Sequence, residues 1–130
     1  MRTLEMEVGT VLPELVVPLT PTLIISTALA TRDFTPVHHD PEQARAQGSR
    51  DIFLNILTTM GLVERFVTDW AGPEALIRGI NVKLGVPAYA GDTLTFSGTV
   101  AAREDDEYTI EVRGTVSLGA HATGTVRLSL

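Results

Sequence analysis

Alternation of apolar and polar residues dominates the second half of the chain. Four stretches follow a period of two, each with one apolar and one polar side, as expected of strands that bury a single face. These stretches are residues 76–86, 94–102, 108–118 and 120–130. The acidic run 104–107 and the pair Leu118-Gly119 are predicted to be the hairpin turns between the last three. The pattern therefore predicts four successive antiparallel strands.

A long helix is predicted before these strands. Asp51 is the expected N-cap, and the helix is expected to run from about Ile52 to Ala71, where Gly72-Pro73 would end it. Apolar residues at helical spacing occupy most of its circumference and leave a narrow polar stripe. The stripe consists of Thr58, Gly61, Arg65 and Asp69. Because a helix that is apolar on nearly every side is normally buried, we expect the strands to wrap around it.

The first 50 residues are less regular. The apolar run Val11–Val17 is interrupted by a proline, and we expect a first strand there, since proline in a strand belongs at its start, at a bulge or on an edge. Residues 24–31 fit either a helix or a strand. Asp40 followed by Pro41 predicts the N-cap and first turn of a short helix, which Gly48 ends.

A strand, a long buried helix and four further strands indicate an antiparallel sheet curled around one central helix, which is the hot-dog arrangement of the α+β class. Glycines within the strands are expected to let the helix approach or the sheet bend; they are Gly98, Gly114 and Gly124. No repeat or linker divides the chain, and its length of 130 residues is near the commonest domain size. We therefore expect residues 1–130 to form a single domain.

Composition and charge narrow the possible functions. The formal net charge is −6 and the pI about 4.9, whereas nucleic-acid-binding proteins usually present a basic face. The lack of cysteine excludes disulfides, a thiol nucleophile and cysteine-bound zinc. No apolar run approaches the roughly 20 residues that span a bilayer, and acidic residues near the N-terminus stand where a signal peptide has a basic region. We expect a cytoplasmic protein that binds neither nucleic acid nor membranes and holds no metal.

The densest group of titratable side chains lies in the segment DFTPVHHD, residues 33–40, which Pro36 predicts to be a loop. A carboxylate and an imidazole on one rigid loop can orient a water molecule and move its proton. The long helix begins shortly afterwards, and the N–H groups of a helix N-terminus can stabilise a negatively charged oxygen. From the residues alone, capping and solvated side chains remain the alternative explanation of this loop, and Asp40 is expected to cap.

Other titratable residues are weaker candidates. His121 falls on the polar side of the last predicted strand and is expected to be exposed. Glu64 is expected on the solvated face of the long helix, although a carboxylate there would suit a thioesterase. Arg78 and Lys83 are candidate partners for phosphate groups, because the chain has only 10 lysines and arginines.

The loop resembles the MaoC-like family, which includes the (R)-specific 2-enoyl-CoA hydratases. The motif of that family is an Asp, two residues, Pro, an aliphatic residue and His, and it is matched by Asp33, Pro36, Val37 and His38. The similarity continues through DPEQARAQG, LTTMGLVERF and the strands. The resemblance implies that Asp33 and His38 are a catalytic pair. They would activate water for addition to a 2-enoyl-CoA thioester, giving a 3-hydroxyacyl-CoA without a cofactor.

The chain departs from the usual family pattern around this motif. The family usually has Ser or Thr and then Gly before the Asp, and Asn before the Pro, where this chain has Thr31, Arg32 and Thr35. The family's helix usually opens with a His-Gly pair whose glycine N–H binds the thioester oxygen. Asn55 and Ile56 align with that pair, so the resemblance implies that they are the oxyanion and substrate-binding residues.

A closer similarity, over residues 50–77 and 84–98, is to the small MaoC-like subunits of bacterial steroid side-chain hydratases. It implies an unsaturated steroid-CoA substrate and a hetero-oligomer, two of each chain, whose larger MaoC-like partner lacks the catalytic pair. A lone hot dog leaves its sheet edges open and cannot enclose a CoA ester, which agrees with a site at an interface. The alternatives are an acyl-CoA thioesterase that uses Asp33 or Glu64, and a non-catalytic subunit that completes a partner's acyl-CoA site.

Overall fold

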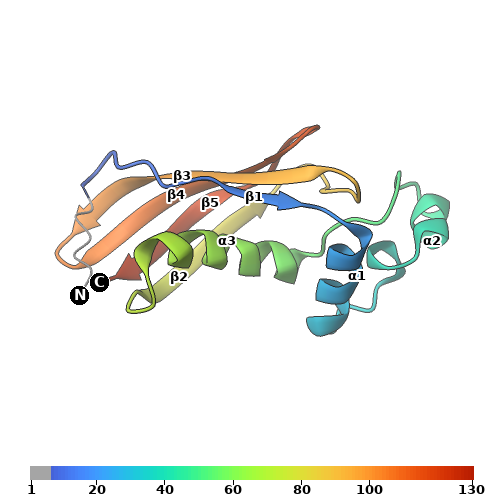
Figure 1. Ribbon diagram of the computed structural model, residues 1–130, viewed down its shortest axis with the longest axis horizontal. Coiled ribbons are helices and arrows are strands. Elements are labelled where there is room, and N and C mark those ends of the chain that lie inside the picture. The colour runs from blue at the N-terminus through green and yellow to red at the C-terminus, as the bar shows by residue number, and fades with distance from the viewer. Residues whose placement is uncertain (1–6) are drawn as a thin grey trace.

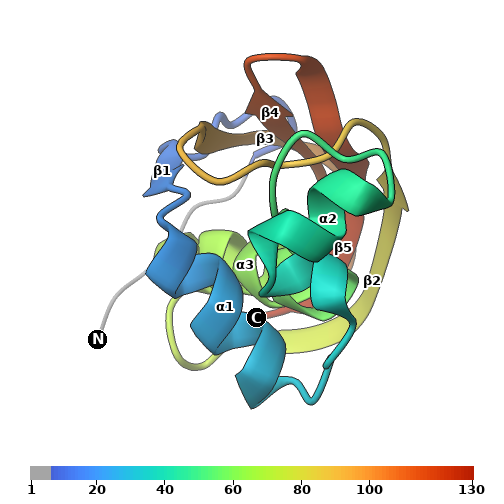
Figure 2. The same cartoon turned by 90° about the vertical axis from the view of Figure 1, so that its right-hand side faces the viewer.

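The computed structural model describes residues 7–130, in which five antiparallel strands form one sheet that curves around a long helix (Figures 1 and 2). The strands are β1 (Leu15–Pro18), β2 (Leu76–Leu84), β3 (Thr93–Glu104), β4 (Glu107–Val116) and β5 (Gly119–Ser129). Their order across the sheet is β1-β3-β4-β5-β2, and the long helix is α3 (Ile56–Ala71). The predicted α+β hot-dog architecture is confirmed. The two expected hairpin turns join β3 to β4 and β4 to β5.

The core lies between the inner face of the sheet and one side of α3. Alternate residues of β4, from Tyr108 to Val116, are buried, as the period of two predicts. They share one apolar cluster with the buried residues of α3, which include Val63, Phe66 and Val67. The ring of Phe66 stacks on that of Phe96 in β3, with centroids 5.9 Å apart. Burying a side chain of this size contributes about 1.5–3 kcal/mol.

Gly98 of β3 allows α3 to approach the sheet closely, as predicted. A Cβ atom at this position would lie 3.0 Å from the ring of Phe66 and 2.7 Å from the carbonyl oxygen of Glu111. Both distances are shorter than ordinary contacts, so a larger residue would have to displace the Phe66 ring of α3 and the neighbouring backbone of β4. The absence of a side chain at this position therefore leaves room for the Phe66 ring against β3.

The predicted start of the long helix is wrong. The helix α3 begins at Ile56 with Asn55 as its N-cap, not near Ile52 with Asp51 as its N-cap. The residues before it are extended, and their backbone pairs with residues 88–90. Burial in an extended segment produced apolar positions that also fit helical spacing. Whether these residues are helical or extended is decided by their pairing with residues 88–90, which are distant in the sequence.

The helix is also less enclosed than predicted within the described chain. Ile56 and Leu57 are 60% and 55% exposed, whereas Thr58 of the predicted polar stripe is buried. The rest of that stripe is exposed as expected, at Gly61, Arg65 and Asp69. The first turn of α3 therefore presents apolar side chains to the surface.

The first strand is shorter than predicted. Instead of covering Val11–Val17, β1 begins at Leu15, and Val11 makes an isolated bridge to Thr99 of β3. Pro13 lies between the bridge and the strand. Proline has no N–H group to donate to the ladder, which accounts for the interruption.

Two helices and one 3-10 turn lie before α3, and both helices sit at one end of the sheet (Figure 1). The helix α1 (Pro21–Ala30) covers the region that fits either a helix or a strand. The 3-10 turn η1 (Pro36–His38) falls within the predicted loop. The helix α2 (Pro41–Ala46) begins as predicted, because the Asp40 carboxylate accepts hydrogen bonds from two first-turn N–H groups at 3.1 and 3.2 Å.

A β-bulge in β5 turns His121 into the fold. Gly114 of β4 pairs with Ala122 and Thr115 pairs with Ala120, so His121 has no opposite residue on β4. An extra residue in one strand shifts the alternation of side chains by one position. The predicted exposure of His121 is therefore wrong, because its side chain is buried and only 4% exposed.

The strand β2 forms one edge of the sheet. Within residues 7–130 its one strand partner is β5, and its outer side carries a row of unpaired peptide groups.

Residues 1–6, part of the acidic stretch that argues against a signal peptide, lie outside the described residues. Among residues 7–130, no helix combines the length and the apolar character needed to cross a membrane.

Candidate active site

Asp33 and His38 lie beside each other in the loop that follows α1. Oδ2 of Asp33 is 3.4 Å from Nε2 of His38. The Asp33 N–H donates to the carbonyl of Ala28 at 2.9 Å, and Arg32 takes a left-handed conformation with φ of 58°, so the chain turns sharply after α1. His38 ends the 3-10 turn η1. Two tight turns therefore bring the two predicted side chains together.

The His38 ring is buried and its orientation is fixed. Nδ1 lies 2.7 Å from the carbonyl oxygen of Phe53, and the ring packs edge-on against the Phe53 ring with centroids 4.9 Å apart. Because a carbonyl oxygen only accepts hydrogen bonds, Nδ1 carries a hydrogen. In the neutral ring, Nε2 is then the nitrogen with a free lone pair, and it faces Asp33.

The Asp33 carboxylate is held by Thr35. The Thr35 hydroxyl donates to Oδ1 at 2.8 Å, and the Thr35 N–H donates to the same oxygen at 3.3 Å. The hydroxyl bond is the main reason that the pKa of Asp33 lies below its ordinary value, with smaller contributions from the backbone bond and from His38, while burial opposes them. Asp33 is therefore a carboxylate anion with some access to the surface, since 26% of its side chain is exposed.

Asn55 connects this loop to the start of α3. Its side chain is fully buried, where Nδ2 donates to Oγ1 of Thr31 at 2.9 Å and Oδ1 accepts from the Thr58 hydroxyl. The nearby Asn55 amide also makes a small contribution that lowers the pKa of Asp33. The side chain does not cap α3, so it leaves the first-turn N–H groups, beginning with that of Ile56, without a side-chain partner from the N-cap.

A pocket of about 300 Å³ opens beside the pair. Its lining residues are Asp33, His38, Phe53, Leu54, Ile56, Leu84, Gly85, Val86, Pro87 and His121. The walls come from the loop after α1, the segment that leads into α3 and the segment that follows β2. Sequence reasoning missed residues 84–87 and His121 as parts of the site. The Gly85-Val86-Pro87 sequence marks the end of a strand, but nothing local indicates that it faces Asp33.

The arrangement suits the activation of a water molecule. A carboxylate oxygen and a ring nitrogen that lie 3.4 Å apart can each accept one O–H of the same water. Ile56 brings the N-terminus of the 16-residue helix α3 to the same pocket. The positive end of a helix dipole stabilises negative charge. Groups that are able to act as a base and to stabilise an anionic oxygen therefore line one cavity.

The other candidate residues lie elsewhere. Glu64 is exposed on α3 and does not line the pocket. Arg78 is exposed and donates from Nε to the Ser129 hydroxyl at 3.0 Å. Lys83 is exposed and lines a neighbouring hollow of about 150 Å³. Residues 7–130 contain no group of three or more side chains arranged to hold a metal ion.

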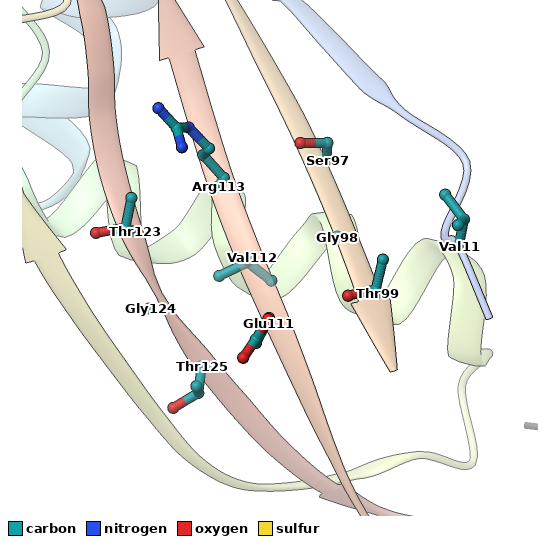
Figure 3. A pocket seen from close by; sticks show the side chains of 10 residues that line it. All are labelled: Val11, Ser97, Gly98, Thr99, Glu111, Val112, Arg113, Thr123, Gly124 and Thr125. Atoms are coloured by element: carbon teal, nitrogen blue, oxygen red, sulfur yellow. The ribbon is translucent and has the colours of Figure 1, made fainter. Parts of the chain in front are cut away.

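A larger hollow of about 460 Å³ lies on the outer face of the sheet, opposite α3 (Figure 3). Serine and threonine side chains of β3 and β5 line it, with Glu111 and Arg113 of β4 between them. It contains neither Asp33 nor His38. A carboxylate with a perturbed pKa beside an oriented imidazole is a stronger mark of an active site than the size of a hollow.

Comparison with known proteins identifies similar sequences. Residues 5–121 match the family model described as MaoC like domain. A curated relative from Mycobacterium tuberculosis, the 3-oxo-4,17-pregnadiene-20-carboxyl-CoA hydratase beta subunit, is 62% identical over 123 residues, which cover 95% of each chain.

Solved structures agree with the sequence comparison. A chain of the ChsH1-ChsH2 complex from Mycobacterium tuberculosis superposes with a TM-score of 0.94 at 61% identity, over 95% of this chain and 98% of that chain. The (R)-hydratase from A. caviae involved in PHA biosynthesis superposes with a TM-score of 0.89 at 23% identity, over 98% of this chain and 99% of that chain. The second likeness concerns the fold alone.

Proposed function

Because this chain belongs to the MaoC-like family, we propose that it is an enoyl-CoA hydratase, which adds water to a 2-enoyl-CoA thioester and forms a 3-hydroxyacyl-CoA. The observation that carries the proposal is the Asp33–His38 pair, with 3.4 Å between carboxylate and imidazole, in a pocket at the start of α3. Hydration involves no net oxidation or reduction, so the reaction requires no redox cofactor. The proposed location is the cytoplasm, where CoA thioesters are made and consumed.

The proposed substrate is an unsaturated CoA ester of a steroid side chain, in steroid catabolism. This choice is supported by the relative with 62% identity, whose name is that of a 3-oxo-4,17-pregnadiene-20-carboxyl-CoA hydratase subunit. Such a substrate is bulky and largely apolar, and three exposed residues that line the pocket are apolar too: Ile56, Leu84 and Pro87.

The proposed reaction starts from a water molecule between Asp33 and His38. The water donates one hydrogen bond to the Asp33 carboxylate and one to Nε2 of His38, which leaves a lone pair to attack C3 of the substrate. As the C3–O bond forms, the pair takes a proton from the water and the C=C electrons move toward the thioester oxygen. A proton from the pair is then delivered to C2, the C=O bond re-forms, and both side chains return to their starting state.

Ile56 and Asn55 are proposed to form the oxyanion site in two different roles: the Ile56 N–H binds the thioester oxygen while it carries negative charge, and Asn55 holds that N–H in place. The Ile56 N–H lies at the N-terminus of α3, where the helix dipole adds to the hydrogen bond. Loss of one oxyanion donor typically lowers kcat by about 10²–10³-fold. The buried amide of Asn55 is bonded to Thr31 and Thr58, so its proposed role is to hold the loop and the helix N-terminus together.

A larger MaoC-like partner subunit is proposed to complete the pocket, in an assembly with two copies of each chain. The relative with 62% identity is named a beta subunit, and the structure with a TM-score of 0.94 is a complex. In the chain itself, Ile56 and Leu84 line the pocket and are exposed, Leu57 beside Ile56 is exposed too, and Leu84 ends the edge strand β2. A partner strand along β2 would satisfy its peptide groups and cover this apolar surface.

The test is to express the chain with its partner and to follow the addition of the mass of one water to steroid and short fatty enoyl-CoA esters. Asp33→Asn and His38→Ala should each lower kcat by about 10²–10⁴-fold, the usual contribution of a general acid or base. His39→Ala is the matched control, because His39 neighbours the pair in sequence but does not line the pocket. Circular dichroism and assembly with the partner would establish that each variant is folded.

The same assay separates the alternatives. Near-normal turnover by both the Asp33 and His38 variants would contradict the proposal and favour a non-catalytic subunit. Release of free CoA thiol from a saturated acyl-CoA, without hydration of the unsaturated one, would favour a thioesterase.

A further inference from the structure

His121 is a buried imidazole at the pocket that the proposed water activation does not use. Its side chain lines the pocket although the residue is only 4% exposed. The β5 bulge turns it inward, since neither Gly114 nor Thr115 of β4 pairs with it. A bulge is a local device that re-aims a side chain, and bulges are frequent next to active sites.

Both nitrogens of the His121 ring are engaged. Nδ1 lies 2.7 Å from the carbonyl oxygen of Val86, and Nε2 lies 2.8 Å from the hydroxyl oxygen of Thr59. The carbonyl only accepts, so Nδ1 donates to it, and Nε2 of the neutral ring accepts from the Thr59 hydroxyl. Burial lowers the pKa of His121, which keeps the ring neutral and this pattern of donors intact.

These bonds connect two walls of the pocket. Val86 belongs to the wall that follows β2, whereas Thr59 lies one turn after Ile56, which lines the wall at the start of α3. The backbone strengthens the first connection, because the Gly85 N–H donates to the carbonyl of His121 at 2.8 Å. The second connection depends on the single hydroxyl of Thr59.

We propose that Thr59, His121 and the carbonyl of Val86 form a buried clamp that sets the spacing between these two walls. The clamp thereby positions the thioester between the oxyanion donor and the Asp33–His38 pair. Thr59 and His121 are positioning residues in this scheme. The inference rests on the proposed function and adds to it the residues that align the substrate.

The expected consequence of breaking the clamp is a loss of kcat with little change in KM. A displacement of about 1 Å in a reacting group can lower the rate about 10²-fold. Most of the binding surface of a CoA ester lies outside the clamp, so affinity should change much less. A substitution that merely loosened the fold would instead lower the amount of active complex and leave the kcat of the folded fraction unchanged.

The experiment compares three variants of the chain assembled with its partner. Thr59→Val keeps the shape but removes the hydroxyl, Thr59→Ser keeps the hydroxyl, and Thr68→Val is the control. Thr68 lies on the same helix, and its hydroxyl bonds to carbonyls of that helix. Thr59→Val should lower kcat at least tenfold per active site with KM within threefold of wild type, while the other two variants should remain within threefold in kcat. Wild-type kcat in Thr59→Val would overturn the clamp.

A second pair of variants covers the case in which Thr59→Val does not assemble. His121→Gln keeps an acceptor for the Thr59 hydroxyl, whereas His121→Leu keeps none. The glutamine variant should retain at least threefold higher kcat than the leucine variant, and equal values would overturn the clamp.

A measurement without turnover separates this inference from the proposed function. Nuclear magnetic resonance of ¹⁵N-histidine in the assembled protein should show His121 as the neutral ring with its proton on Nδ1, and Thr59→Val should shift the Nε2 resonance. If the wild-type complex did not hydrate any enoyl-CoA ester, the proposed function would be contradicted even if the ¹⁵N-histidine spectrum were as expected. An Nδ1 without a proton would overturn the clamp even in an active hydratase.

Discussion

Nδ1 of His38 lies 2.7 Å from the carbonyl oxygen of Phe53, so the segment that leads into α3 also fixes the tautomer of the His38 ring. Phe53 is itself held by its bridge to Tyr89 and by its N–H, which donates to the carbonyl of Val37 at 3.2 Å. The loop that carries His38 and the start of the helix that carries the proposed oxyanion donor therefore form one unit. A shift of either would change the direction in which Nε2 points toward Asp33.

Thr35→Val should raise the pKa of Asp33, because the Thr35 hydroxyl bond is the largest cause of its low value. The carboxylate would then become protonated at a higher pH than in the wild type. Because the reaction requires the ionised carboxylate, the fall in kcat at acidic pH should also begin at a higher pH. Near neutral pH kcat should fall less than about tenfold, since Asp33 remains ionised there. Titration of the Asp33 carboxyl carbon by nuclear magnetic resonance measures the shift. Thr35→Ser should keep the low pKa, and an unchanged pKa in Thr35→Val would contradict the assignment.

The free energy of unfolding should contain a pH-dependent contribution from His121. Burial lowers the pKa of this ring in the folded state below its ordinary value of about 6.5. As pH falls below about 6.5, the unfolded chain binds a proton at His121 before the folded chain does, so stability decreases. The slope from one group is at most about 1.4 kcal/mol per pH unit.

Urea unfolding of the assembled wild type and His121→Gln, between about pH 7.5 and pH 5.5, measures this contribution by difference. The wild type should lose more stability than the variant as pH is lowered. Parallel pH profiles would show that His121 binds a proton equally well in the folded state.

Two glycine substitutions should change stability in opposite directions. Gly98→Ala should destabilise by about 1–3 kcal/mol, because its Cβ would lie 2.7 Å from the carbonyl oxygen of Glu111. Gly61→Ala should stabilise by about 0.5–1 kcal/mol, because Gly61 is an exposed residue inside α3 and, apart from its chain neighbours and the helix backbone, no atom lies within 4 Å of the added carbon. The urea concentration at half unfolding should be lower than that of the wild type for Gly98→Ala and higher for Gly61→Ala. A Gly98→Ala variant as stable as the wild type would mean that β3 and β4 do not approach each other at Gly98 as closely as described.

Asp40→Ala removes the N-cap of α2 and should lower the free energy of unfolding by about 1 kcal/mol. The Asp40 carboxylate accepts from the N–H groups of Glu42 and Gln43, and alanine would leave both without this partner. Asp40→Asn keeps an acceptor oxygen and should retain most of the stability. Thermal unfolding of the two variants compares them directly, and equal losses would assign the effect to charge rather than to capping.

Local patterns predicted the parts of the fold that depend on neighbouring residues. The period of two located the inner face of β4, and Asp40 with Pro41 located the start of α2. The proximity of Asp33 and His38 was also predictable, because both lie in one proline-containing loop. In each case the determining contacts are close in the sequence.

Features that depend on distant partners were not predictable in this way. The apolar residues before Asn55 fit a helix until residues 88–90 pair with them. His121 belongs to the polar side of its strand until the pairing between β4 and β5 slips by one residue at Gly114. The pocket wall at residues 84–87 likewise depends on β5 and α3, so its place beside Asp33 is a property of the assembled sheet.

The unpaired edge of β2 has a consequence for how such a chain is produced. The peptide groups on the outer side of β2 have no partner strand within residues 7–130. They can therefore pair with the same edge of another copy of the chain, which is a common route to aggregation. Chains made in excess of the proposed partner would face this hazard, whereas chains made in equal number would be covered soon after folding. The geometry of one strand would therefore favour the linked expression of two genes at matched levels.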